Sequence, residues 1–127
     1  MEGTSVQAAL LEGYRVENAT RSLEWFADEP ESIGGTNTAP KPSELLLSAL
    51  ASCKLITMRM YAERKGWDVS GLEVDLEIIE KSDKTLLSKK ITFPDNLDQA
   101  QRDRLTEISG RCPVAKMVSE SFEYVIL

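Results

Sequence analysis

Residues 41–66, KPSELLLSALASCKLITMRMYAERKG, decide the fold of this chain. The stretch predicts one long helix, because Pro42 suits a first helical turn and Ser43 is a residue type that caps helices. Glu44 lies where the helix dipole favours an anion, and cationic residues followed by Gly66 are typical of a helix end. Apolar residues recur around the whole circumference, so we expect most of this helix to be buried.

The segments on either side have the patterns of strands and shorter helices. Residues 4–27 predict two or three strands with a turn at Asn18–Thr20, and residues 28–42, rich in proline and glycine, predict an irregular connection. Gly34–Gly35 allow the backbone to bend closely there. After the long helix, the predicted elements are strands at Leu72–Ile78 and Leu86–Phe93, helices at Asp95–Gly110 and Pro113–Met117, and a strand at Phe122–Ile126. This order predicts an α+β fold in a single domain, residues 1–127, with antiparallel sheets around a central helix.

Composition and charge exclude several classes of function. The 127 residues carry 15 basic and 21 acidic side chains, a net charge of −6, which argues against nucleic acid or an anionic membrane as partner. No signal peptide or membrane span is predicted, so we expect a cytoplasmic protein. Histidine is absent, which excludes Ser-His-Asp and Cys-His catalysis and histidine metal sites. Two cysteines cannot form a four-thiolate zinc site, and we expect no metal or cofactor.

Cys53 and Cys112 are the candidate chemical groups. Cys112 precedes Pro113, which predicts that it caps a helix where free backbone N–H groups favour a thiolate. Cys53 lies in the middle of the long helix and gains no such help. In the cytoplasm two cysteines indicate redox chemistry more than a structural disulfide, although both could instead be small buried hydrophobes. If their α-carbons lie within roughly 7 Å, a disulfide and a peroxidase cycle become possible.

The run GGTNTAPKPSELLLSALASCKLITMRMYAERKGW at residues 34–67, followed by RCPVAK at residues 111–116, resembles the OsmC/Ohr family. This resemblance implies an intertwined homodimer with active sites at the subunit interface. It also implies a cysteine-based peroxidase that favours organic hydroperoxides and uses no metal or haem. By this resemblance Cys53 is the reactive cysteine that attacks the peroxide, and Cys112 is the resolving one.

The resemblance further implies an arginine and a glutamate that activate the reactive cysteine. Glu44 and Arg21 are the candidates here, with Arg15 as the other arginine before the helix. Ser43 occupies the position of the family's glutamate, and Glu44 follows it. On an ideal helix the nine residues between Glu44 and Cys53 rotate by about 180°, so Glu44 is alternatively a partner of the helix dipole alone.

These observations lead to one main hypothesis of function and one alternative. In the main hypothesis, Cys53 reduces a hydroperoxide and becomes a sulfenic acid, Cys112 condenses with it to a disulfide, and an external dithiol restores both thiols. In the alternative, a non-catalytic OsmC-like dimer binds a small hydrophobic ligand in an interface pocket.

Overall fold

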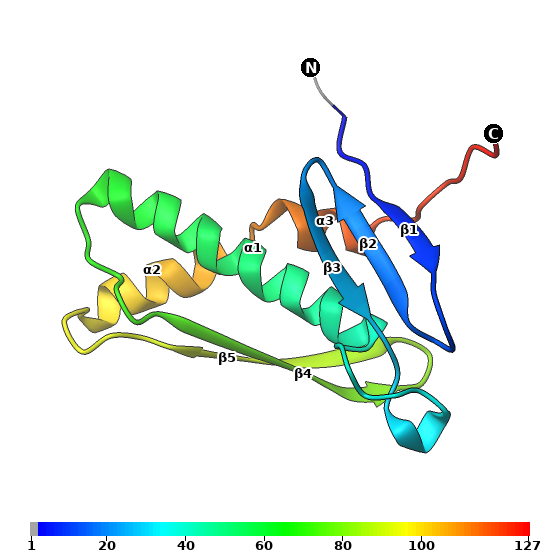
Figure 1. Ribbon diagram of the computed structural model, residues 1–127. Coiled ribbons are helices and arrows are strands. Elements are labelled where there is room, and N and C mark those ends of the chain that lie inside the picture. Colours follow the sequence, from blue (N-terminus) through cyan, green and yellow to red (C-terminus); the bar gives the residue numbers. More distant parts are fainter. Residues whose placement is uncertain (1–2) are drawn as a thin grey trace. The chain divides into compact units, whose positions relative to one another are not determined.

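The predicted α+β class is confirmed by a computed structural model, which describes residues 3–127 (Figure 1). The chain divides into two units, one ending at Leu46 and the other spanning Leu47–Leu127. Each unit contains one antiparallel sheet, and the long helix α1, Pro42–Lys65, begins in the first unit and lies mostly in the second.

The first unit is a three-stranded sheet in the order β1-β2-β3. Its elements are β1 Gln7–Leu10, β2 Val16–Thr20, β3 Leu23–Ala27 and the short 3-10 helix η1 Glu31–Ile33. The turn predicted at Asn18–Thr20 is wrong, because Asn18 pairs with both neighbouring strands, opposite Ala8 and Trp25. The chain turns instead at Arg21, whose φ of 54° suits a tight reversal.

The irregular segment predicted before α1 is confirmed, and it folds around the buried carboxylate of Asp28. This carboxylate accepts hydrogen bonds from the backbone and hydroxyl groups of Thr36 and Thr38, and from the Glu29 amide. These bonds, with that of Thr36 the largest cause, hold the pKa of Asp28 well below its ordinary 3.8. A Cβ at Gly35 would lie 1.9 Å from the Glu29 carbonyl oxygen, so the close approach requires glycine.

The ends of α1 follow the predicted signals with one change. Its N-terminal amide at Lys41 is capped by Glu44, whose Oε1 accepts a hydrogen bond at 3.0 Å, and not by Ser43. At the other end Gly66 has a φ of 71°, and its amide bonds the Glu63 carbonyl. The next amide, of Trp67, bonds the Ala62 carbonyl at 2.8 Å, which completes a Schellman end.

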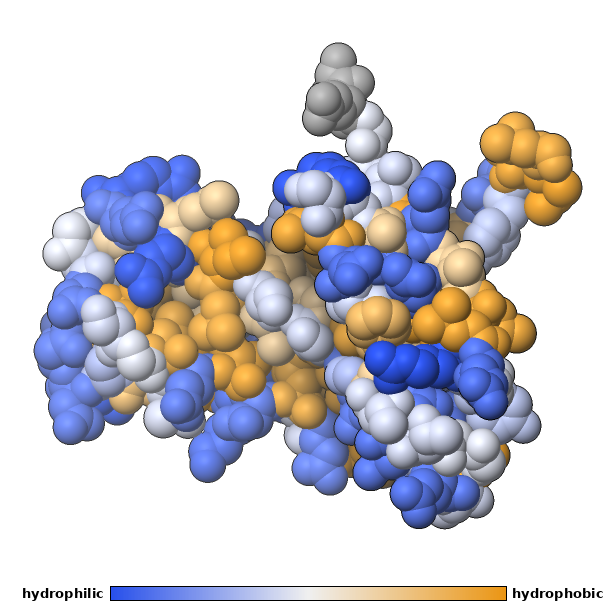
Figure 2. Space-filling model, viewed as in Figure 1, coloured by the Kyte–Doolittle hydropathy of each residue, from blue (hydrophilic) through white to orange (hydrophobic). Residues whose placement is uncertain are grey.

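Fewer residues of α1 are buried than the sequence predicted. Only Leu50, Lys54, Met58 and Ala62 are buried, a single stripe at four-residue spacing. Ile56 and Met60 are more than half exposed, because the chain covers one face of the helix. Figure 2 shows this hydrophobic surface over α1. The prediction of a mostly buried helix is therefore wrong for the single chain.

By length and composition α1 could also cross a membrane, and it is the one helix in residues 3–127 that could. Core helices of globular domains share those properties. Met58 and Ala62 of α1 are members of the hydrophobic core, so α1 acts as a core helix.

The second unit packs α1 against a hairpin and a second helix in one hydrophobic core, and a third helix follows in the chain (Figure 1). Its other elements are β4 Glu73–Lys81, β5 Thr85–Thr92, α2 Gln99–Ser109 and α3 Pro113–Ser119. Val74 pairs with Ile91 across the hairpin, and both pack against the core, so the predicted apolar face is confirmed. The buried core residues are Met58, Ala62, Val69, Leu97, Leu105 and Ile108.

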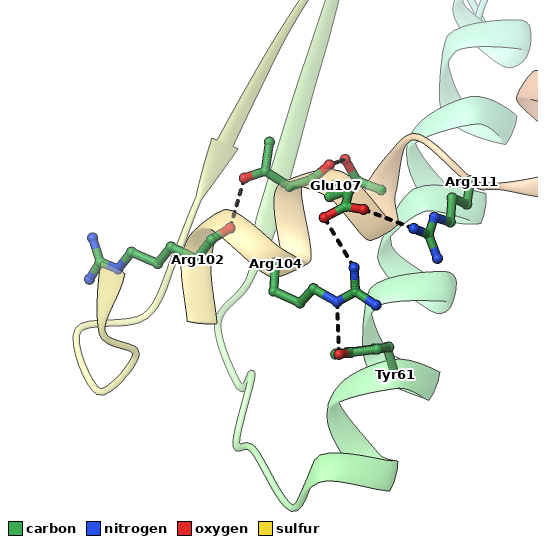
Figure 3. A network of polar contacts seen from close by, with 7 residues as sticks. Tyr61, Arg102, Arg104, Glu107 and Arg111 are labelled. Atoms are coloured by element: carbon green, nitrogen blue, oxygen red, sulfur yellow. Dashed lines mark hydrogen bonds and ion pairs between the residues drawn. The ribbon is translucent and has the colours of Figure 1, made fainter. Parts of the chain in front are cut away.

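Helix α2 begins later than predicted. The Asp98 side chain caps it in a reciprocal box with Gln101, so residues 95–97 form a turn before the helix instead of its first residues. Arg104 then connects α2 to α1 by donating to the Tyr61 hydroxyl at 2.9 Å, and it also pairs with Glu107 at 3.0 Å (Figure 3). This contact helps to fix the end of α2, from which the chain leads into Cys112.

The strand predicted at Phe122–Ile126 is wrong. Residues 121–127 have no regular structure, and their apolar side chains are exposed, with Tyr124 at 81% and Ile126 at 88%. A strand needs a neighbouring strand for its hydrogen bonds, and within residues 3–127 no strand pairing includes this segment.

Candidate active site

Both cysteines lie on helical elements of the second unit, as predicted. Cys53 is half-buried in the middle of α1, where its carbonyl accepts a hydrogen bond from the Thr57 hydroxyl at 2.7 Å. Cys112 is fully buried at the N-cap of α3, with Pro113 as the first helical residue. Both are free thiols here, so the disulfide between them stays a prediction.

Lys54 connects the two cysteines through the fold. It follows Cys53 in the chain, and its ammonium donates to Cys112 Sγ at 3.7 Å and to the Ser109 carbonyl at 3.2 Å. The residue is only 9% exposed. Lys54, the chain neighbour of Cys53, thus contacts Cys112, so the two thiols lie on adjoining elements.

Lys89 of β5 adds a second cation to this cluster. Its ammonium donates to the Ser109 hydroxyl at 3.1 Å. Although much of the Lys89 residue is exposed, partial burial lowers its pKa below 10.5, and the positive charge of Lys54 lowers it further. The sulfur of Cys112 acts in the opposite direction. Ser109, Lys54, Lys89 and Cys112 therefore form one polar cluster between helix and sheet.

A cavity of about 320 Å³ opens beside this cluster. It is formed by α1, the β4–β5 hairpin and α3, all in the second unit. Its lining residues are Leu50, Lys54, Leu76, Leu87, Lys89, Ala115, Val118 and Ser119. The walls are mainly apolar, and the two lysines supply the only formal charges among these eight residues.

Glu44 is engaged in a structural contact at the start of α1. Its carboxylate accepts the Lys41 amide, the reciprocal contact of a capping box. This geometry agrees with the alternative that Glu44 stabilises the helix terminus. Its predicted role beside Cys53 stays a prediction.

The two N-terminal arginines differ in their surroundings. Arg21 is exposed in the turn between β2 and β3. Arg15 lies over the ring of Phe26 at 4.3 Å and donates to the Thr38 hydroxyl, which in turn bonds the Asp28 carboxylate. Within the first unit the Arg15 side chain is thus held by two contacts, with Phe26 and with Thr38, whereas Arg21 has no such contacts among the described residues. The predicted role of Arg21 in activation stays a prediction.

The described part of the chain offers no ready metal site. Among residues 3–127, no group of three or more His, Cys, Asp or Glu side chains could hold a metal ion. The chemistry of the cluster is that of one thiol, Cys112, with ammonium neighbours.

Comparison with known protein families decides the classification. The family model described as "OsmC-like protein" matches residues 35–125, which include α1, both cysteines and the whole hairpin. The chain belongs to the OsmC-like family. No curated protein matches this OsmC-like chain.

Solved structures share the fold of this OsmC-like chain. A Psychrobacter arcticus protein, provisionally named an osmotic stress induced and detoxification response protein, matches with a TM-score of 0.79 and 24% identity, covering 92% of this chain and 90% of that one. An OsmC-like protein from Mycoplasma pneumoniae matches with a TM-score of 0.73 and 19% identity over 93% and 88% of the two chains. The organic hydroperoxide resistance protein OhrB of Bacillus subtilis matches with a TM-score of 0.62 and 15% identity over 90% and 88%. The predicted OsmC/Ohr fold is confirmed.

Lys54, Lys89 and Ser109 were missed by the sequence analysis of this OsmC-like chain. A signal was present, because Lys54 shares the four-residue spacing of Leu50 and Met58 on the buried stripe. Lys89 likewise alternates with Leu87 and Ile91 in β5. A lysine within an apolar periodicity therefore marks these positions, although a lysine is usually assigned to the surface.

Proposed function

We propose that the chain is a thiol peroxidase that reduces organic hydroperoxides. The observation that carries the proposal is the arrangement of Cys53, Lys54 and Cys112, in which an ammonium next to one cysteine contacts the sulfur of the other. Membership of the OsmC-like family supports it, as does the fold shared with an organic hydroperoxide resistance protein.

In the proposed cycle, the Cys53 thiolate attacks the peroxide. A sulfur–oxygen bond forms, the oxygen–oxygen bond breaks, and the departing alkoxide takes a proton to become an alcohol. The Cys112 thiolate then attacks the Cys53 sulfenic acid, so that a disulfide forms and water leaves. The Lys54 ammonium is placed to stabilise negative charge on Cys112 before this step. An external dithiol returns two electrons and becomes a disulfide itself.

The assembly and partners form part of the same proposal. We expect a cytoplasmic homodimer. Exposed apolar side chains on α1, such as Ile56 and Met60, support it, as do the exposed apolar side chains of Phe122 and of residues 124–127. A site at a subunit interface leaves room for an arginine, Arg21 or Arg15, to reach Cys53 in the dimer. The partners are a small hydroperoxide and a dithiol reductant.

The test is consumption of cumene hydroperoxide by the reduced protein with excess dithiothreitol. We expect turnover by the wild-type protein, none by Cys53→Ser, and slow turnover by Cys112→Ser, whose sulfenic acid must be reduced directly by the external thiol. If the wild-type protein retains both thiols and consumes no hydroperoxide, the proposal is wrong.

A second candidate function is a non-catalytic dimer that binds a small hydrophobic ligand at its interface. It is favoured by one observation, the engagement of the Glu44 carboxylate in capping α1, which takes it away from thiol activation. Unchanged ligand affinity in Cys53→Ser, together with a wild-type protein that does not turn over, would select this function.

A further inference from the structure

Two lysines occupy positions where the pattern of their elements calls for apolar residues. Lys54 belongs to the buried stripe of α1 between Leu50 and Met58. Lys89 stands on the inward face of the hairpin, directly opposite Leu76 in the strand register. Both ammonium groups bond Ser109, one to its carbonyl and the other to its hydroxyl, so they converge on one point.

The positive charge at this point is not balanced by a carboxylate. Within residues 3–127 the salt bridges join Arg104 and Arg111 to Glu107, and neither involves Lys54 or Lys89. Burial is the largest cause of the lowered pKa of Lys89, and the charge of Lys54 lowers this pKa further, which is the sign of two cations close together. Burying a charge without a counter-ion costs stability, so an anion at this point would relieve an existing penalty.

The cavity beside the lysines is suited to an apolar chain. Leu50, Leu76, Leu87 and Val118 line it, and its volume of about 320 Å³ lies at the lower end of the range for small-molecule sites. A bare inorganic anion would leave these walls in contact with water. A neutral hydrocarbon would leave the two cations unbalanced. A molecule with an anionic head and an aliphatic tail satisfies both parts of the site.

We propose that this cavity binds a small carboxylic acid with an aliphatic chain, its carboxylate between Lys54 and Lys89 and its chain along the leucine walls. The head is a carboxylate because two separate ammonium groups suit a single compact monoanion. The tail is short because the cavity is small. The site lies within the second unit and needs no thiol chemistry, so it goes beyond the peroxidase function and does not depend on it.

The test is isothermal titration of the reduced protein with octanoate, without any peroxide. The comparison ligands are octanol, which keeps the chain, and acetate, which keeps the head. We expect octanoate to bind at least tenfold more tightly than either. Lys54→Met and Lys89→Met should each weaken octanoate at least tenfold, whereas Lys90→Met, a matched control on the outward face of β5, should bind as the wild type does.

Several results would overturn the proposal. Equal affinity for octanol and octanoate would show a hydrophobic cavity without anion recognition, and an equal loss in Lys90→Met would show unspecific charge attraction. Absence of octanoate binding at millimolar concentration would exclude the site. Ala115→Phe, which fills the cavity and keeps both lysines, provides a second test: retained octanoate affinity in this variant would place the ligand elsewhere. The titrations use no peroxide, and the turnover assay with Cys53→Ser and Cys112→Ser uses no octanoate, so the two proposals fail separately.

Discussion

The replacement Lys54→Met should stabilise the protein although it removes hydrogen bonds from the cluster. Methionine has a similar length and keeps the apolar stem of the side chain in the buried stripe. What disappears is the ammonium of a residue that is 9% exposed, and this ammonium has a carbonyl and a sulfur as partners. A residue kept for function at a cost in stability behaves in this way.

The magnitude follows from two opposing contributions. Desolvating a buried ion costs several kcal/mol after relaxation of its surroundings. Its removal leaves the Ser109 carbonyl without this donor, which costs about 1–3 kcal/mol. The desolvation cost is the larger because, within residues 3–127, no carboxylate forms a salt bridge with Lys54. We therefore expect a net gain of about 1–2 kcal/mol in the free energy of unfolding. For a chain of this length that gain corresponds to a rise in Tm of roughly 4–8 °C.

Urea unfolding followed by far-UV circular dichroism measures this change. The midpoint should rise in Lys54→Met with an unchanged denaturant slope, and the exposed control Lys90→Met should unfold as the wild type does. A fall of the Lys54→Met midpoint by the equivalent of 1 kcal/mol or more would refute the reasoning, since it would make Lys54 a structural anchor.

Three further predictions concern other parts of the molecule. The pKa of Lys89 is lowered in the folded state, so as the pH rises toward 10.5 the folded chain loses this proton before the unfolded chain does. The free energy of unfolding of the wild type, relative to that of Lys89→Met, should therefore increase over this pH range. Urea midpoints of the two proteins that run parallel with pH would contradict this. Gly35→Ala should lower the urea midpoint and speed proteolysis of the loop, because its Cβ meets the Glu29 backbone; unchanged proteolysis would argue against the tight approach. Glu44→Gln should keep both stability and peroxidase turnover, because the glutamine side-chain oxygen can also accept the Lys41 amide. Glu44→Ala should lower the free energy of unfolding by about 0.3–1.5 kcal/mol. Loss of turnover in Glu44→Gln would assign Glu44 to thiol activation.

Local sequence signals predicted the elements that depend on local chemistry. The long helix ends at Gly66 because a left-handed residue closes it, and Cys112 occupies the N-cap position of α3 because Pro113 suits the first helical residue. Alternation in Leu72–Ile78 predicted the first strand of the hairpin. These signals act within a few residues and need no knowledge of distant contacts.

The wrong or missed predictions concern features that depend on contacts between residues far apart in the sequence. Residues 122–126 alternate like a strand, but residues 3–127 contain no strand that pairs with them. The apolar circumference of α1 predicted burial of most of the helix, whereas a single chain covers one face of it. Lys54 and Lys89 escaped notice because their meeting at Ser109 depends on the packing of helix against hairpin, which sequence periodicity does not specify.

The most direct test of the peroxidase account is mass spectrometry of the reduced protein after one equivalent of cumene hydroperoxide. The account predicts the loss of two hydrogen atoms and a peptide map in which Cys53 and Cys112 are joined by a disulfide. In Cys112→Ser it predicts one added oxygen on Cys53. A wild-type protein with unchanged mass, or oxygen added to Cys112 while Cys53 stays a thiol, would contradict it.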